Sequence, residues 1–141
     1  MKIRTIIITL AIVTLLIGTA IYRYNYVENT ERLELLESSY EIASESEKAN
    51  TYNSNVLYFL NQQRYKSFLR EVVRDKKTDK IIVDYINMIL PYYNLTSDNT
   101  SAEYTARLEE ISDVTYAYKS KLSLNDRLKI AEFQVKAIKE K

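Results

Sequence analysis

A run of eighteen residues without a charged side chain, Thr5–Tyr22, constrains most strongly what this chain can fold into. As a helix the run is about 27 Å long at ~1.5 Å per residue, close to the ~30 Å hydrocarbon core of a bilayer. Arg23 follows at once, flanked by Tyr22 and Tyr24, and amphipathic rings beside a cation are typical of a membrane interface. The run therefore predicts a membrane anchor that places residues 5–22 in lipid.

Two alternatives to an anchor are open for the same run. Gly18 and Ala20 would stand at the −3 and −1 positions of a signal-peptide cut after Ala20, and the remaining chain would then be secreted. A buried helix of a soluble protein is the other alternative, although the rest of the chain offers little to cover so apolar a rod. If the run is an anchor, its orientation follows from the positive-inside bias, because Lys2 and Arg4 precede the run and only Arg23 closely follows it. This bias predicts a single-pass cell-membrane protein with a cytoplasmic N-terminus and an extracytoplasmic C-terminal domain.

Several residue types are rare or absent, and this narrows both fold and chemistry. The chain has no His, Cys or Trp and only one Gly and one Pro among 141 residues. Ser-His-Asp and Cys-His catalysis and the common zinc, haem and iron–sulfur sites need residues that are absent. Phosphate-binding loops need several glycines, and β folds need many tight turns. We therefore expect an all-α protein that is not an enzyme and holds no cofactor or metal.

The chain divides into three predicted parts: an anchor at 1–22, an acidic juxtamembrane helix at 23–49 and a helical bundle at 50–141. Residues Val27–Lys48 contain few helix breakers and should continue the membrane helix outward. An apolar seam with 3-4-3 spacing then leans on the domain's own core: Leu33, Leu36, Tyr40 and Ala43. The asparagines of Ala49–Asn55 predict the first loop.

Two further helices are predicted before the only proline. Val56–Arg74 has an apolar arc opposite a basic one. Asp79 can cap a short apolar helix at Lys80–Leu90, for which a strand is the alternative because of its β-branched residues. Pro91 disfavours α conformation at Leu90 and should close the element, which leaves Tyr92–Thr100 as a loop.

The C-terminal part contains two clear helix starts. Thr100 and Glu103 form a capping box, and Ser123 with Asp126 resembles a second cap. The helix after the first cap carries a stripe at 4-3-4-3-4 spacing: Tyr104, Leu108, Ile111, Thr115, Tyr118 and Leu122. The expected fold is an up-and-down bundle of four to five helices, with the short apolar helix at its centre.

Charge is segregated along the chain although the net charge is only +1. Glu28–Glu47 has seven acids against one cation, and Arg64–Lys80 and Lys119–Lys141 each have seven cations against three acids. Acidic and basic helices can lie beside each other in one bundle, or either stretch can dock a charged partner. The charged docking residues are then predicted to be Glu34, Glu37, Glu41, Lys66, Arg70 and Arg74. No global basic patch indicates nucleic acid.

The last predicted helix carries two apolar stripes, whereas a terminal helix usually needs one. The first stripe contains Leu124, Leu128, Ala131, Val135 and Ile138, and the second contains Ile130, Phe133 and Ala137. If the second stripe is exposed, it forms a partner surface together with Tyr116, one of thirteen tyrosines. If the helix instead lies in a groove between two neighbours, both stripes are buried within the bundle.

One carboxylate stands out in the apolar helix. Asp84, with Asn87 three residues later, would have a raised pKa if it were desolvated there. The alternative is that Asp84 lies on an exposed or hydrogen-bonded stripe of a mostly buried helix, because no second acid is placed near it by sequence.

Two functions of different classes fit these observations. The first is an accessory or scaffold subunit of a cell-envelope or membrane complex, which binds another protein in a homo- or hetero-oligomer. The alternative is an extracytoplasmic sensor or inhibitor (immunity-type) module that binds a small ligand or a foreign effector. A pocket of convergent polar groups inside the bundle would favour the second function, and an apolar or charged outer patch would favour the first.

Overall fold

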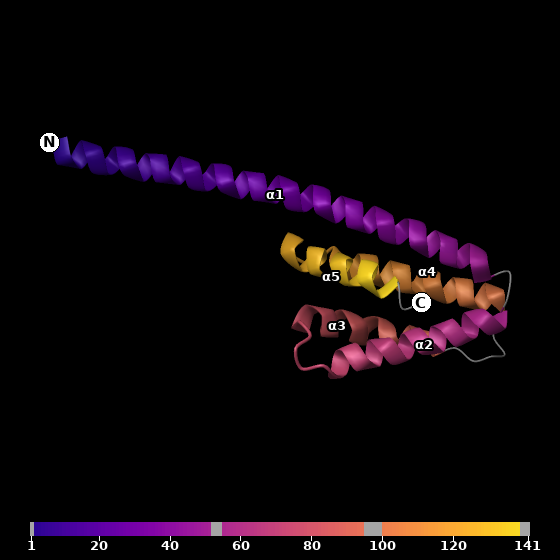
Figure 1. The fold of residues 1–141 in the computed structure, drawn as a ribbon. Helices are drawn as coiled ribbons and strands as arrows, with labels where there is room; N and C mark the ends of the chain where they lie inside the picture. Colours follow the sequence, from indigo (N-terminus) through magenta and orange to yellow (C-terminus); the bar gives the residue numbers. More distant parts are fainter. Residues whose placement is uncertain (1, 52–54, 95–99, 139–141) are drawn as a thin grey trace.

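The computed structural model describes residues 2–51, 55–94 and 100–138, and the regular elements among these residues are all helices, with no strand. Five α-helices and one short 3-10 helix follow one another along the chain (Figure 1). The predicted all-α class is confirmed, and the segment for which a strand was the alternative is a helix.

Helix α1, Lys2–Thr51, is 50 residues long, which corresponds to about 75 Å at ~1.5 Å per residue. Its N-terminal half projects beyond the rest of the molecule, and its C-terminal half lies along the other helices (Figure 1). An apolar window in this helix has a mean hydropathy of 2.1 and is not buried, so α1 is long and apolar enough to cross a membrane. The prediction that the apolar run continues outward as one helix is confirmed.

The first predicted loop is shorter than expected. Helix α1 continues through Ala49 to Thr51, and α2 (Asn55–Arg74) begins at what was predicted to be the last loop residue. The asparagine-rich composition therefore marks the connection correctly but not its bounds, because Asn is tolerated in the last and first turns of helices. Residues 52–54 lie outside the described residues.

Helix α3, Lys80–Ile89, begins at the predicted cap: the Asp79 carboxylate accepts a hydrogen bond of 3.1 Å from the Ile81 amide. The prediction for Leu90 is wrong, because this residue has α-helical angles (φ −54°, ψ −37°) in front of Pro91. The chain continues as the 3-10 helix η1, Leu90–Tyr93, so Tyr92 and Tyr93 are helical and not part of a loop as predicted. Residues 95–99 of the predicted loop Tyr92–Thr100 lie outside the described residues. Pro91 lies in the first turn of η1, where its missing amide hydrogen leaves no bond unmade.

Both predicted caps of the C-terminal part are confirmed. Helix α4 (Ser101–Lys119) opens with a reciprocal capping box, in which the Thr100 hydroxyl accepts from the Glu103 amide at 3.3 Å and the Glu103 carboxylate accepts from the Thr100 amide at 2.6 Å. Helix α5 (Leu124–Ala137) opens with the Ser123 hydroxyl accepting from the Asp126 amide at 3.2 Å. These caps fix where each helix enters the bundle.

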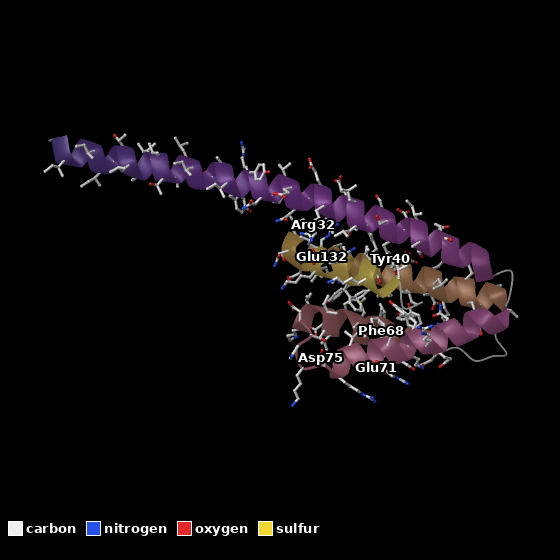
Figure 2. The ribbon with its side chains drawn as sticks, in the orientation of Figure 1. Arg32, Tyr40, Phe68, Glu71, Asp75 and Glu132 are labelled. Carbon is white, nitrogen blue, oxygen red and sulfur yellow. The ribbon has the colours of Figure 1, made fainter. Side chains whose placement is uncertain are left out.

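The core forms around α3, which packs against α2, α4 and α5. Its inward face is buried and consists of Ile82, Tyr85, Ile86 and Ile89. A second, smaller cluster joins α1 to α5, with Leu33 against Leu128 and Ala131. Leu33 and Leu36 of the predicted seam therefore pack on the domain's own core, and Figure 2 shows the side chains that fill the space between these helices.

Helix α5 buries both of its stripes, which corrects the expected partner surface. Ile130 and Ala137 are completely buried in the main core. Phe133 stacks on Phe68 of α2 with ring centroids 6.4 Å apart and meets Tyr85 of α3 edge-on at 6.3 Å. The reason is the position of α5 in a groove, since α1 covers one stripe while α2 and α3 cover the other.

Candidate functional site

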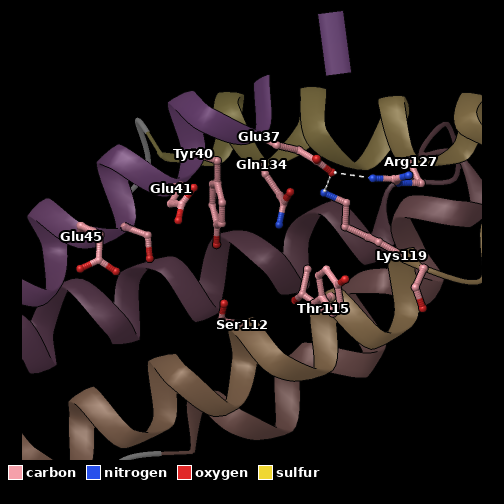
Figure 3. Close-up of a pocket in the computed structure, with 12 residues that line it drawn as sticks. Glu37, Tyr40, Glu41, Glu45, Ser112, Thr115, Lys119, Arg127 and Gln134 are labelled. Atoms are coloured by element: carbon pink, nitrogen blue, oxygen red, sulfur yellow. Dashed lines mark ion pairs between the residues drawn. The ribbon is translucent and has the colours of Figure 1, made fainter. Parts of the chain in front are cut away.

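The most polar cavity described lies where the C-terminal half of α1 meets α4 and α5 (Figure 3). Its volume is about 610 Å³. We call it the α1/α4/α5 pocket; its walls are Glu37, Tyr40, Glu41, Ser44, Glu45, Ser112, Thr115, Tyr116, Lys119, Ser120, Arg127 and Gln134. Acids, bases and hydroxyls therefore converge on one space inside the bundle.

Helix α1 supplies the acidic wall. Glu37, Glu41 and Glu45 follow one another at four-residue spacing, which places them on one face of the helix. Tyr40 and Ser44 of α1 also line the pocket, and Figure 3 shows Tyr40 between Glu37 and Glu41. This face adjoins the apolar seam, so the contact that holds α1 on the bundle also positions the carboxylates over the pocket.

Helix α4 contributes two small hydroxyl side chains to the pocket wall. Ser112 and Thr115 stand on the face toward α1, where larger apolar residues would fill the space. Tyr116 is 79% exposed and lies at the rim. Small hydroxyl side chains thus make this cavity polar as well as open.

A three-residue ion cluster closes one end of the pocket. The Lys119 ammonium lies 2.6 Å from the Glu37 carboxylate, and the Arg127 guanidinium lies 3.5 Å from the same oxygen. The Lys119 side chain is only 10% exposed, and it also stands in the last turn of α4, where the helix dipole favours a cation. Glu37 therefore fixes α1 to both α4 and α5 (Figure 3).

Two polar atoms beside this cluster lack hydrogen-bond partners among the described residues: the Thr115 hydroxyl and the Arg127 Nε. Both atoms are buried, and Thr115 as a whole is 8% exposed. A buried donor without a partner costs about 1–3 kcal/mol, so native proteins usually satisfy such groups with another group or a bound molecule. Each of these atoms has less than 1 Å² of accessible surface, so neither is open to an occupant of the pocket in this structure.

The floor of the pocket connects to the apolar core. Gln134 is 3% exposed, and its amide donates a hydrogen bond of 2.9 Å to the hydroxyl of Tyr85 on α3. The ring of Tyr85 packs in the main core against Phe133. A change in the position of Gln134 would therefore reach the centre of the bundle.

The structure divides the predicted charged docking residues into two groups. Glu37 and Glu41 line the pocket, whereas Glu34 is exposed outside it. Lys66, Arg70 and Arg74 belong to α2, and Arg70 and Arg74 are exposed. Glu37 of the acidic stretch Glu28–Glu47 forms ion pairs with Lys119 and Arg127 of the basic stretch Lys119–Lys141. The expectation that an acidic and a basic segment lie beside each other therefore holds for these two stretches.

The basic residues of α2 form a separate feature. Lys66 donates a hydrogen bond to the Asn94 side chain, and burial together with the nearby Arg70 lowers the pKa of the Lys66 ammonium. Arg70, Pro91 and Asn87 border a small cavity of about 220 Å³ beside them. Two cations, Lys66 and Arg70, therefore lie at the junction of α2 and η1, and Arg70 is exposed there.

Asp84 is not desolvated in the apolar helix. Its carboxylate lies 2.6 Å from the Lys80 ammonium and is 44% exposed, and this hydrogen bond raises the pKa of Lys80. The second interpretation, a hydrogen-bonded stripe on a mostly buried helix, is the one found. A group of three or more potential metal ligands is not found among the described residues.

Sequence reasoning missed several pocket residues, namely Ser112, Lys119, Arg127 and Gln134. One signal was present: Thr115 interrupts an otherwise apolar stripe, and Lys119 follows it one turn later. A polar pair at core positions indicates a polar interior. The partners on α1 and α5 carry no comparable local signal.

Comparison with known proteins gives no further guide, because no family model, curated protein or solved structure matches the chain. What the fold itself defines is a helical bundle built on a long helix whose first half is apolar and exposed.

Proposed function

We propose that the chain is a single-pass membrane-anchored sensor module that binds a small polar ligand in the α1/α4/α5 pocket. The observation that supports this most is the composition of the pocket wall. One side of the wall belongs to the helix that carries the apolar segment, and the other side belongs to α4 and α5. A ligand in the pocket therefore contacts both the bundle and the helix that leads to the membrane.

The anchor part of the proposal rests on exposure. Large apolar side chains from Ile3 to Ile21 are about half exposed or more, and insertion into lipid would remove this apolar surface from water. Lys2 and Arg4 before the segment support a cytoplasmic N-terminus and an extracytoplasmic bundle.

Orientation can be tested directly because the chain has no cysteine. Lys76→Cys places a thiol on the exposed connection between α2 and α3. A membrane-impermeant maleimide added to intact cells should label this variant. Labelling only after cell lysis would place the bundle in the cytoplasm.

Ligand binding is tested by thermal unfolding of the full chain in lipid nanodiscs, with Ala-Ala, acetate and methylammonium as probes. A ligand that binds only the folded state raises Tm, and at least one probe should do so. Ser112→Trp fills the pocket and should abolish the rise, whereas Asp113→Trp, an exposed neighbour outside the pocket, should retain it. No rise with any probe, or an equal rise in both variants, would contradict the proposal.

A second function, an accessory subunit that binds another protein, is favoured by the basic face of α2. Arg64, Arg70 and Arg74 are exposed there, on a helix that packs on the opposite side of the bundle from α1 (Figure 1). Such a face suits an acidic surface of a partner in the membrane complex. Loss of co-purifying proteins on Arg70→Glu with Arg74→Glu, at an unchanged Tm, would support this function.

A further inference from the structure

One end of the bundle presents exposed cations without carboxylate partners. Arg74 is the last residue of α2, Lys76 and Lys77 belong to the connection from α2 to α3, and Lys121 lies in the turn between α4 and α5. All four side chains are exposed, and none forms an ion pair with a residue that the structure describes. We call these four residues the basic end.

The charge of the basic end is not cancelled locally. The two connecting segments there, residues 74–80 and 120–126, contain five cations against three acids. One of the acids, Asp79, is already neutralised by Lys129 of α5 at 2.8 Å. One of the cations, Lys80, is neutralised by a carboxylate of α3 at 2.6 Å. The four cations of the basic end therefore exceed the remaining carboxylates of these segments.

Contacts with α1 place the start of α5 toward the apolar segment. Leu33 of α1 packs against Leu128, and Leu124, the first residue of α5, belongs to the same cluster. Helices α1 and α5 run in the same direction, as the labelled residues along each of them show (Figure 3). Leu124 therefore lies about 6 Å nearer than Leu128 to the apolar segment, at ~1.5 Å per residue. The connection from α2 to α3 lies at this end of the bundle as well (Figure 1).

This geometry brings the basic end close to the membrane surface that the anchor defines. Leu33 follows Tyr22, the last residue of the apolar run, by eleven residues, or about 16 Å. The start of α5 is therefore about 10 Å from the end of the apolar run. The headgroup region occupies roughly 5–8 Å of this distance, and electrostatic interactions at physiological salt extend over ~8 Å. Exposed lysines at this level are within electrostatic range of the headgroups.

The side of α1 that faces away from the bundle has the opposite charge. Glu28 and Glu31 are exposed, and they lie about 140° and 160° around the helix from Leu33, at ~100° per residue. A negatively charged bilayer repels these carboxylates and attracts the basic end. Both effects favour a tilt of α1 that brings the bundle onto the membrane, and transmembrane helices commonly tilt by ~20°.

We propose that the basic end docks on anionic phospholipid headgroups of the membrane that holds α1. A lipid surface fits this end better than an acidic protein does, because the anchor keeps the basic end beside headgroups at a high effective concentration. Docking holds the bundle at one angle to the membrane. This inference rests on the anchor part of the proposed function and does not involve the pocket.

Contact with headgroups can be measured at one site, because the chain contains no cysteine of its own. Asn125→Cys, at an exposed position in the first turn of α5, is labelled with a fluorophore in the full chain. The labelled chain is reconstituted in vesicles that contain a lipid with a nitroxide quencher on its headgroup. Quenching should be at least about twofold stronger in mixed phosphatidylglycerol and phosphatidylcholine than in phosphatidylcholine alone, and high salt should remove the difference.

Matched charge variants of the labelled chain assign the effect to the basic end. The test variant replaces three cations of the basic end by glutamine: Lys76→Gln, Lys77→Gln and Lys121→Gln. The control variant replaces three exposed cations away from that end: Arg64→Gln, Arg107→Gln and Lys136→Gln. Both variants have the same net charge. The test variant should lose the extra quenching, and the control variant should retain it.

A high-salt wash of the vesicles separates this inference from the proposed function. Release of the chain from phosphatidylcholine vesicles would overturn the anchor and the proposed function with it. Equal quenching in both lipid mixtures, by a chain that stays with the vesicles, would overturn the docking and leave the anchor intact. Equal loss in the test and control variants would indicate a response to net charge and overturn the assignment to the basic end. Unchanged quenching in the test variant, with loss of proteins that co-purify with the wild type, would make this end a protein-binding surface instead.

Discussion

Replacing Phe133 with Ala tests whether the second stripe of α5 is core or surface. The ring stacks on Phe68 and meets Tyr85 edge-on, and it packs against the main core without being completely buried. Removing a fully buried Phe side chain costs about 3–5 kcal/mol, so the half-buried ring should cost roughly 2–4 kcal/mol. Domains of 60–100 residues lose ~4–8 °C of Tm per kcal/mol, which predicts a decrease of roughly 8–32 °C.

The assay is thermal unfolding of the full chain in nanodiscs, followed by the near-ultraviolet circular dichroism of the tyrosines, which reports packing in the bundle. Tyr116→Ala is the matched control, because Tyr116 is 79% exposed and its loss should change the free energy of unfolding by less than about 0.5 kcal/mol. If Phe133→Ala kept the wild-type Tm, the ring would not contribute to the core, and the partner surface would again need to be considered.

Three further predictions concern charge and the anchor. Glu37→Gln should lower the free energy of unfolding by about 1–2 kcal/mol, because it leaves the nearly buried Lys119 without its carboxylate. Glu34→Gln, at an exposed position, is the control and should leave stability unchanged. Equal Tm values for the two variants would refute a stabilising role of the ion cluster. Hydrogen bonds from the Lys129 ammonium and from the Ile81 amide lower the pKa of the Asp79 carboxyl below its ordinary value of 3.8. The ionised Asp79 therefore stabilises the folded state above pH 3.8, and this stabilisation is lost as the pH falls through the lowered pKa. Asp79→Asn should therefore have a lower Tm than wild type at neutral pH and an equal Tm in strong acid, and a gap that persists in acid would count against the ion pair. The chain should stay with membranes in a high-salt wash, since apolar insertion is not screened, and a soluble species that begins at residue 21 would instead indicate a cleaved signal peptide.

The features that the sequence determined are local ones. The length of the apolar run Thr5–Tyr22 and the scarcity of Gly and Pro are sufficient to predict a long exposed helix and an all-α fold. The capping box of Thr100 and Glu103 is complete within four residues, so its hydrogen bonds do not depend on the rest of the fold. Local reasoning failed where two tendencies compete, as at Leu90, because a 3-10 turn accepts Pro91 without losing a hydrogen bond.

Only the tertiary structure decided which surfaces are covered and which charges meet. Both stripes of α5 are apolar, and the burial of Ile130 and Ala137 follows from the placement of α5 between α1 and α3, which no periodicity in α5 specifies. Glu37 resembles its neighbours Glu34 and Glu41 in sequence, yet among the described residues it is the one of the three that forms ion pairs, with Lys119 and Arg127. The pocket depends on three helices that are distant along the chain, because a cavity forms from side chains that pack in space and leaves no pattern in any one segment.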